Sequence, residues 1–161
     1  LLATARHTLN MHPGYLPDCR GNDNAAWTIR GSTRAGVSMN VITEGVDEGP
    51  LWGRLEIDYG FPTTGRQLYT RLEAACGELF RRDWPGLRAG QIEPEAQEEA
   101  GPTRRRRETN ADRVIDLDAD AAAGVLIDKL LAHDFTPNTT AEVVRRGRRY
   151  KATLKVVPID D

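Results

Sequence analysis

The chain has 161 residues, of which 39% are hydrophobic and 29% charged, and its formal net charge is −2 at pH 7. This length allows one domain with a real core, and the composition is that of an ordinary soluble globular protein. The small negative charge excludes an overall basic field that would attract nucleic acid or a membrane. Because no apolar run approaches the roughly 18 residues that cross a bilayer, we expect no membrane partner.

The cysteines indicate the cellular compartment of the protein, and the first residues indicate whether the chain starts at a natural beginning. Cys19 and Cys76 form no C-x-x-C pattern, which argues against a secreted disulfide scaffold and favours a reducing cytoplasm. The cysteines and histidines have no usable ligand spacing, so we expect no metal. The start lacks the features of a signal peptide. It begins with Leu1 shortly before a strong motif, which is typical of the middle of a gene product or of a shortened chain.

The first predicted element is a short buried strand, "HTLNM". Period-two alternation places Asn10 and His12 on one face of this strand and Met11 on the other. Residues 13–21 contain two prolines and two glycines, so we expect an irregular loop there.

Two further strands and two helices follow in the first half. A short helix is predicted from Asp23 to Arg30, with Asn22 or Asp23 as its cap and Gly31 at its end. Alternation in "AGVSMNVIT" predicts a strand, "EGVDEGP" an acidic turn, and "LWGRLEID" another strand. The strongest helix signal spans Thr64–Arg82, closed by Trp84 and Pro85. Its apolar residues recur at spacings of three and four, at Leu68, Leu72, Ala75 and Leu79.

The second half is more polar. Residues 89–107 are rich in Gln, Glu, Pro, Gly and Arg, which predicts an extended surface segment. A second helix is predicted to follow Asp118 as its cap and to run to about His133. Its expected apolar stripe consists of Ala122, Val125, Leu126 and Leu130. Two β-rich runs around Arg146 and Gly147 predict a terminal hairpin.

Several polar and aromatic residues have simpler interpretations. His7 and His133 are expected on the surface. The basic runs "TRRRRE" and "VVRRGRRYK" could bind phosphate or RNA, but neighbouring acids neutralise them, and a solvated surface or a sugar-nucleotide diphosphate contact is favoured. Tyr15, Trp27, Tyr69 and Trp84 are expected to pack in the core or at its rim, and Tyr15 and Trp27 could border an acceptor pocket.

Three polar residues stand next to strand ends and turns, and together they indicate acyl transfer to an amine. Asn10 can donate its amide to a carbonyl oxygen that develops negative charge. His12 can polarise or protonate the same oxygen, and a partly buried Asp47 can take and return a proton. Each alone has a plain alternative: His12 could cap a strand end, and Asp47 could simply form a turn. Asn10 is otherwise unfavourable in a strand, which strengthens the functional interpretation.

The segments "LNMHPGYLPDCRG" and "GVSMNVITEGVDEGPL" resemble the formyltransferase family that uses 10-formyltetrahydrofolate. The Asn-x-His-Pro motif of that family and its later Asp match Asn10, His12, Pro13 and Asp47. The compact tail is similar to the subgroup that formylates amino sugars, whereas methionyl-tRNA formyltransferases carry a separate β-barrel domain there.

The resemblance implies roles for these positions. Asn10 and His12 would hold the formyl oxygen, and Asp47 would manage the proton that leaves the attacking amine. The folate would bind largely through the backbone of the turn. The implied folate-binding residues are Thr43, Glu44, Gly45, Val46 and Asp47.

The resemblance also implies an α/β fold, the carboxyl-terminal portion of a Rossmann-like formyltransferase domain followed by a helix and a C-terminal β-hairpin. Residues 1–90 would be the C-terminal half of the catalytic domain, 91–112 a linker or surface segment, and 113–161 a small subdomain. The acceptor is expected to be a primary amine on a nucleotide-linked amino sugar. Alternatives are a non-catalytic binding or assembly module and a tRNA-formylating enzyme. The upstream half-domain that such enzymes have is absent from the sequence, and a homo-oligomer is expected.

Overall fold

The centre of the molecule is a three-stranded antiparallel sheet in the order β1-β3-β4. The computed structural model describes residues 8–31, 33–97 and 101–159. Its sheet consists of β1 (Leu9–His12), β3 (Ala35–Val41) and β4 (Leu51–Ile57), which confirms the three predicted strands. Residues 35–40 of β3 are buried, as expected for the middle strand. The predicted mixed α/β fold is therefore confirmed.

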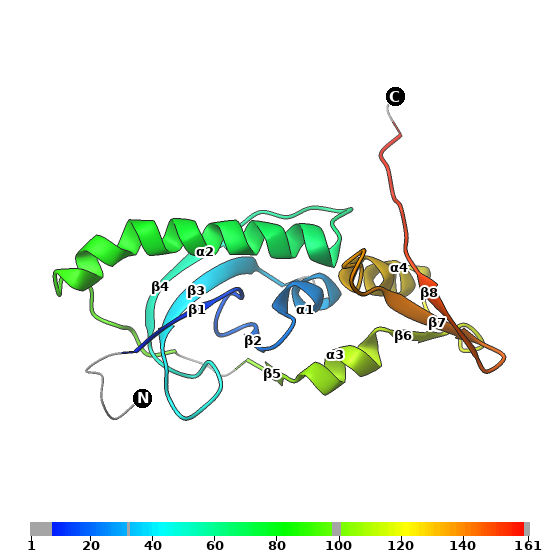
Figure 1. Ribbon diagram of the computed structural model, residues 1–161, viewed down its shortest axis with the longest axis horizontal. Helices are drawn as coiled ribbons and strands as arrows, with labels where there is room; N and C mark the ends of the chain where they lie inside the picture. Colours follow the sequence, from blue (N-terminus) through cyan, green and yellow to red (C-terminus); the bar gives the residue numbers. More distant parts are fainter. Residues whose placement is uncertain (1–7, 32, 98–100, 160–161) are drawn as a thin grey trace.

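A long helix, α2 (Gly65–Arg88), lies across the sheet (Figure 1). Thr64 caps its start in a reciprocal arrangement, because its hydroxyl accepts from the Gln67 amide and the Gln67 side chain accepts from the Thr64 amide. The predicted apolar stripe is confirmed, and it packs on Val37 and Met39 of β3 to form the core. The buried stripe residues are Leu68, Leu72, Ala75 and Leu79.

The prediction that Trp84 and Pro85 close this helix is wrong, since α2 continues to Arg88 with Pro85 inside it. Proline removes its own amide donor, but its carbonyl can still accept in a helical turn. The Pro85 carbonyl accepts from the Ala89 amide at 3.1 Å, so the final turn is completed. Pro85 is exposed, and the defect therefore leaves the buried stripe undisturbed.

The first short helix, α1 (Asn24–Gly31), ends at Gly31 as predicted. The carbonyl of Asp23, rather than a side-chain cap, accepts from the Ala26 and Trp27 amides. The Asp23 backbone is left-handed (φ 60°), and its carboxylate pairs with Arg106 at 3.0 Å. The expected side-chain cap is thus replaced by an ion pair to a distant segment.

The segment expected to be an extended surface stretch contains regular structure. Residues Thr103–Arg104 form β5, which pairs in parallel with β2 (Arg20–Gly21), and α3 spans Arg106–Asp112. Glu95 also forms an isolated antiparallel bridge with Leu51 at the start of β4. The polar composition did not reveal these contacts because they use backbone groups, which every sequence supplies.

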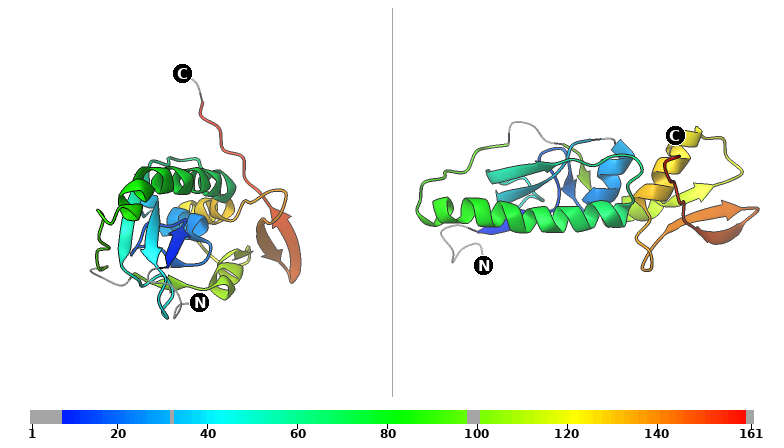
Figure 2. Two further views of the ribbon diagram at one scale, coloured as in Figure 1. Left: turned by 60° about the vertical axis from the view of Figure 1, so that its left-hand side comes forward. Right: turned by 90° about the horizontal axis from the view of Figure 1, so that it is seen from above.

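A second three-stranded sheet occupies the end of the molecule, with the order β6-β7-β8. The hairpin of β7 (Ala141–Arg145) and β8 (Arg148–Ala152) turns at residues 146 and 147, as predicted. The strand β6 (Val114–Asp116) pairs in parallel with β7 and was missed, because three residues carry no recognisable period. Figure 2 shows this hairpin projecting beyond the N-terminal end of α2.

The second predicted helix begins later than expected, since α4 spans Ala123–Ala132. The carboxylate of Asp118 does not cap it and accepts instead from the Arg146 amide at 2.9 Å. The predicted stripe is also wrong at Ala122, which precedes the helix, and at Val125, since both are exposed. Leu126 and Leu130 are half-buried, whereas Leu131 and Ala132 are buried. The helix packs on α1 and buries only its last turn, so helical periodicity selected the wrong residues.

His133 is buried, which corrects its expected surface position, while His7 lies outside the described residues. The His133 Nε2 atom is 2.8 Å from Asp112 Oδ2. Asp112 also lies 2.9 Å from Arg30 and 3.6 Å from Lys129. Burial opposes ionisation of Asp112, but hydrogen bonds from His133 and Arg30 and the charges of Arg30 and Lys129 outweigh it. They hold the pKa of Asp112 well below its usual range. This charged cluster connects α1, α3 and α4.

Across the described ranges, no helix has both the length and the apolar character needed to span a membrane.

Candidate active site

The end of β1 and the turn after β3 bring Asn10, His12 and Asp47 together. The Asn10 Nδ2 atom donates to Asp47 Oδ1 at 3.3 Å and to Asn40 Oδ1 at 3.2 Å. The His12 Nδ1 atom lies 3.4 Å from Asp47 Oδ2. The strand alternation predicted from the sequence thus places Asn10 and His12 on the side that Asp47 approaches.

His12 is oriented by main-chain and amide contacts on its far side. Its Nε2 atom lies 2.7 Å from the Cys19 carbonyl and 3.1 Å from the Asn24 side-chain amide. A carbonyl oxygen can only accept, so we assign a hydrogen to Nε2. That assignment leaves Nδ1 as the atom that faces Asp47, where a proton can be exchanged.

Asp47 is held in a left-handed conformation, with φ 55°. Aspartate tolerates this region better than most residues, because its short polar side chain can bond locally. Here the side chain accepts instead from the Gly21 amide, at 2.9 Å from Oδ2. The carboxylate therefore faces three donors or potential donors: the Asn10 amide, the His12 ring and the Gly21 amide. The side chain is 13% exposed, so little water competes for it.

Gly14 allows the loop after His12 to fold back closely on the imidazole ring. A Cβ atom at this position would lie 2.7 Å from His12 Nε2 and 2.9 Å from the Cys19 carbonyl. Real Cβ contacts are longer than this, so a side chain at Gly14 would displace the ring or the loop. The Pro-Gly step that ends the strand is therefore part of the geometry of the site.

Three supporting residues escaped the sequence analysis as site residues. Asn40 is buried and accepts a hydrogen bond from Asn10. The side chain of Asn24 contacts the His12 ring. Gln97 donates to the carbonyls of Asp47 and Gly49 at 2.8 and 2.7 Å. Asparagine is depleted in strands, so Asn40 in "AGVSMNVIT" carried the same signal as Asn10. Nothing in the sequence marks Gln97, which is 50 residues from Asp47.

A cavity of about 270 Å³ opens beside Asn10 and Asp47. Most of the predicted folate-binding residues line it together with Asn40 and Ile42. Those predicted residues are Thr43, Gly45, Val46 and Asp47. Glu44 is exposed and is not among the lining residues.

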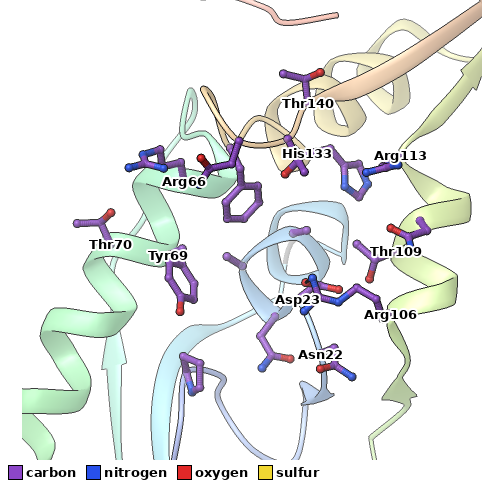
Figure 3. A pocket seen from close by; sticks show the side chains of 18 of the residues that line it. Asn22, Asp23, Arg66, Tyr69, Thr70, Arg106, Thr109, Arg113, His133 and Thr140 are labelled. Carbon is purple, nitrogen blue, oxygen red and sulfur yellow. Dashed lines mark ion pairs between the residues drawn. The ribbon is translucent and has the colours of Figure 1, made fainter. Parts of the chain in front are cut away.

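A larger cavity, about 560 Å³, lies between α2, α3 and the start of α1 (Figure 3). It reaches Pro13, which follows His12 in the chain, Gly21, and Asn24, whose side chain contacts the His12 ring. Arg66 and Tyr69 of α2 lie on one side, and Arg106 of α3 lies on the other. The cavity thus joins cationic and aromatic groups to the loop that positions the imidazole.

Three buried side-chain oxygens of residues that line this larger cavity have no hydrogen-bond partner among the described residues. They are Asn24 Oδ1, Asp23 Oδ2 and Thr140 Oγ1. A buried acceptor without a donor costs free energy comparable to a lost hydrogen bond. These atoms have almost no solvent-accessible surface, so they form part of the cavity wall.

The sequence profile of the formyl transferase family matches residues 1–82. The chain belongs to this family. Methionyl-tRNA formyltransferase from Myxococcus xanthus is 34% identical over 94 residues, which are 58% of this chain and 30% of that protein. The enzyme of the same name from Solibacter usitatus is 32% identical, over 59% of this chain and 31% of that protein. The chain therefore spans about a third of the length of the curated relatives it matches.

Solved structures share the fold of this family member almost throughout. A candidate sugar N-formyltransferase from Mycobacterium tuberculosis superposes with a TM-score of 0.89 at 22% identity, covering 96% of this chain and 67% of that one. A 4-N formyltransferase from Francisella tularensis gives 0.87 at 20% identity, covering 94% and 63%. The Rossmann-like formyltransferase fold expected from the sequence is thus confirmed.

Proposed function

We propose that this formyl transferase chain forms part of an N-formyltransferase that moves a formyl group from 10-formyltetrahydrofolate to a primary amine. The convergence of Asn10, His12 and Asp47 carries this proposal. A hydrogen-bond donor, an imidazole and a carboxylate meet around one point, as transfer of an acyl group to an amine requires.

Each of these side chains can perform one task. The Asn10 side-chain amide donates to the formyl oxygen as negative charge develops there. In the free protein the same amide nitrogen donates to Asn40 and Asp47, so one of these hydrogen bonds is exchanged for the bond to the substrate. In its doubly protonated form, His12 donates from Nδ1 toward the same centre, while its Nε2–H stays bound to the Cys19 carbonyl. Asp47 accepts the proton that the amine loses on attack. Contacts near 3.3 Å in the free protein are expected to shorten when substrate binds.

The smaller cavity suits the pterin part of the donor. Peptide groups of the turn after β3 surround it, and a pterin edge presents both N–H donors and oxygen acceptors that such groups can bind. Thr43, Gly45, Val46 and Asp47 would hold it, with Glu44 at the exposed edge of the turn. The donor supplies the formyl carbon: its bond to N10 breaks as the new amide forms, N10 takes up the proton that Asp47 accepted from the amine, and tetrahydrofolate leaves.

The larger cavity suits an acceptor amine that carries anionic groups. Arg66, Arg106 and Arg113 line it, and arginine recognises phosphate oxygens with two parallel hydrogen bonds. Asp23 and Asn24 line the same cavity, and a side-chain rearrangement that exposes their oxygens would let them bind sugar hydroxyls or the amine itself. We therefore propose a nucleotide-linked amino sugar as the acceptor. The structural neighbours include a sugar N-formyltransferase from Shewanella sp. FDAARGOS_354, which supports this choice.

Methionyl-tRNA is the second candidate acceptor, because the two relatives described above are named methionyl-tRNA formyltransferases. This alternative requires a surface that binds RNA. The basic runs on α3 and on the β7–β8 hairpin would have to provide it. A non-catalytic binding or assembly module is the third candidate, and a homo-oligomer is compatible with each of the three.

Tetrahydrofolate release distinguishes these candidates. The chain alone, and in parallel the full product of the gene that encodes it, is incubated with 10-formyltetrahydrofolate and a panel of nucleotide-linked amino sugars or methionyl-tRNA. Asn10→Ala is the matched control. We expect release with an amino sugar and not with the control. Release only with methionyl-tRNA favours the second candidate. Neither release nor folate binding by calorimetry favours the non-catalytic module.

A further inference from the structure

Gln97 connects the two segments that hold the Asp47 carboxylate beside His12. Its Nε2 donates to the carbonyls of Asp47 and Gly49 at 2.8 and 2.7 Å. Its Oε1 accepts from the Arg20 guanidinium, at 2.7 Å from Nη2 and 3.3 Å from Nε. A carbonyl only accepts and a guanidinium only donates, so these partners determine the orientation of the amide.

The two connected segments are the turn after β3 and the short strand β2. The turn carries Asp47 in its left-handed conformation, and β2 carries Gly21, whose amide donates to Asp47 Oδ2. Arg20, next to Gly21, is 5% exposed, so its guanidinium is fixed within the protein. Gln97 therefore holds both the backbone of Asp47 and the strand that binds its carboxylate.

The segment that carries Gln97 is itself anchored to the central sheet. The Glu95 amide donates to the Leu51 carbonyl at 2.8 Å, and the Leu51 amide donates to the Glu95 carbonyl at 2.7 Å. Two residues after this bridge, the Gln97 side chain reaches the turn. Since Leu51 begins β4, the rigidity of the sheet is transmitted to the Asp47 turn.

We propose that Gln97 is a positioning residue for the reaction, which acts by holding the Asp47 carboxylate in register with the His12 imidazole. This inference rests on the proposed function. A misplacement of about 1 Å at a reacting group can reduce a rate about 100-fold. Gln97→Met keeps the length of the side chain and removes its hydrogen bonds. We expect it to lower kcat about 10- to 100-fold.

The decisive test observes His12 in the folded chain without substrate. The chain has three histidines, so ring-¹⁵N labelling gives few signals, and His12→Asn assigns the relevant set. We expect Gln97→Met to shift the His12 Nδ1 resonance by more than its line width, in the direction that Asp47→Asn shifts it. The His133 signals should stay in place. Adding Gln97→Met to Asp47→Asn should produce no further shift, because the two residues act in series.

Gln91→Met is the matched control, since Gln91 is exposed in the same segment, and it should leave the His12 signals unchanged. Should Gln97→Met fail to fold by circular dichroism, Gln97→Glu replaces it. Glutamate can still accept from Arg20 but cannot donate to the two carbonyls. The proposal is overturned by unchanged His12 signals, by equal shifts at His133, or by the unfolding of both variants. Shifts without formyl transfer would retain the positioning role and remove the proposed function.

Discussion

Asp112→Asn is the sharpest test of how α3 and α4 are held against α1. The substitution keeps the shape of the side chain and removes the charge that faces Arg30, His133 and Lys129 at 2.9, 2.8 and 3.6 Å. Removing one partner from a fully buried ion pair costs about 3–5 kcal/mol. The Arg30 and Lys129 side chains are 17% and 21% exposed, so water compensates part of the loss. We therefore expect the free energy of unfolding to fall by about 2–3 kcal/mol.

The loss should depend on pH in a defined direction. The folded-state pKa of Asp112 lies below its unfolded value, so the stabilisation is complete above the unfolded pKa of about 3.9. It is lost as the pH falls further toward the folded pKa. Urea unfolding followed by circular dichroism measures the difference between wild type and variant at pH 7, 5 and 3.5. Asp120→Asn, at an exposed position, is the control.

Two results would refute this reasoning. One is a difference below about 0.5 kcal/mol at pH 7, which is the usual size of a surface substitution. The other is a difference that stays constant down to pH 3.5, because the charge of Asp112 would then not be its source.

Three further predictions concern the site and the core. Asn10→Ala should lower kcat about 100- to 1,000-fold through loss of a donor to the developing charge, measured by tetrahydrofolate release; an effect confined to KM would contradict that role. Arg66→Ala should raise KM for the nucleotide-linked sugar about tenfold and leave KM for the donor unchanged, whereas Arg88→Ala, at the far end of α2, should change neither. Leu72→Ala removes a side chain that is 1% exposed and should lower the free energy of unfolding by about 3 kcal/mol in urea titrations, while a loss under 1 kcal/mol would mean that the core collapses around the gap.

The helices and strands that have strong periodic or turn signals could be predicted from the sequence. The stripe Leu68, Leu72, Ala75 and Leu79 predicted α2, and alternation predicted the strands of the central sheet. The unusual asparagine in a strand, followed by His12 and a Pro-Gly step, pointed to Asn10 as a chemical group. These signals are local, because side chains at helical or strand spacing share a face whatever surrounds them.

Several features depended on contacts between distant segments. His133 pairs with Asp112, 21 residues away. This hydrogen bond offsets the free energy that burying a polar ring would otherwise cost. The helix α2 continues beyond Pro85 because the proline removes only one backbone N–H donor, at an exposed position. The small β2–β5 pairing and the Glu95 bridge consist of backbone hydrogen bonds, which leave no pattern in the residue types.

By itself, the sequence determined the family resemblance, the central strands, the long helix, the terminal hairpin and the identity of the three polar residues proposed for catalysis. The tertiary structure alone decided that His12 and Asp47 face each other at 3.4 Å. It also decided that Gln97 binds the Asp47 carbonyl and Gly21 the Asp47 carboxylate, and that His133 is buried. The physical reason is that residue type and spacing report on the chain's near neighbours. The position of a carboxylate against an imidazole depends instead on hydrogen bonds from segments that meet only after folding.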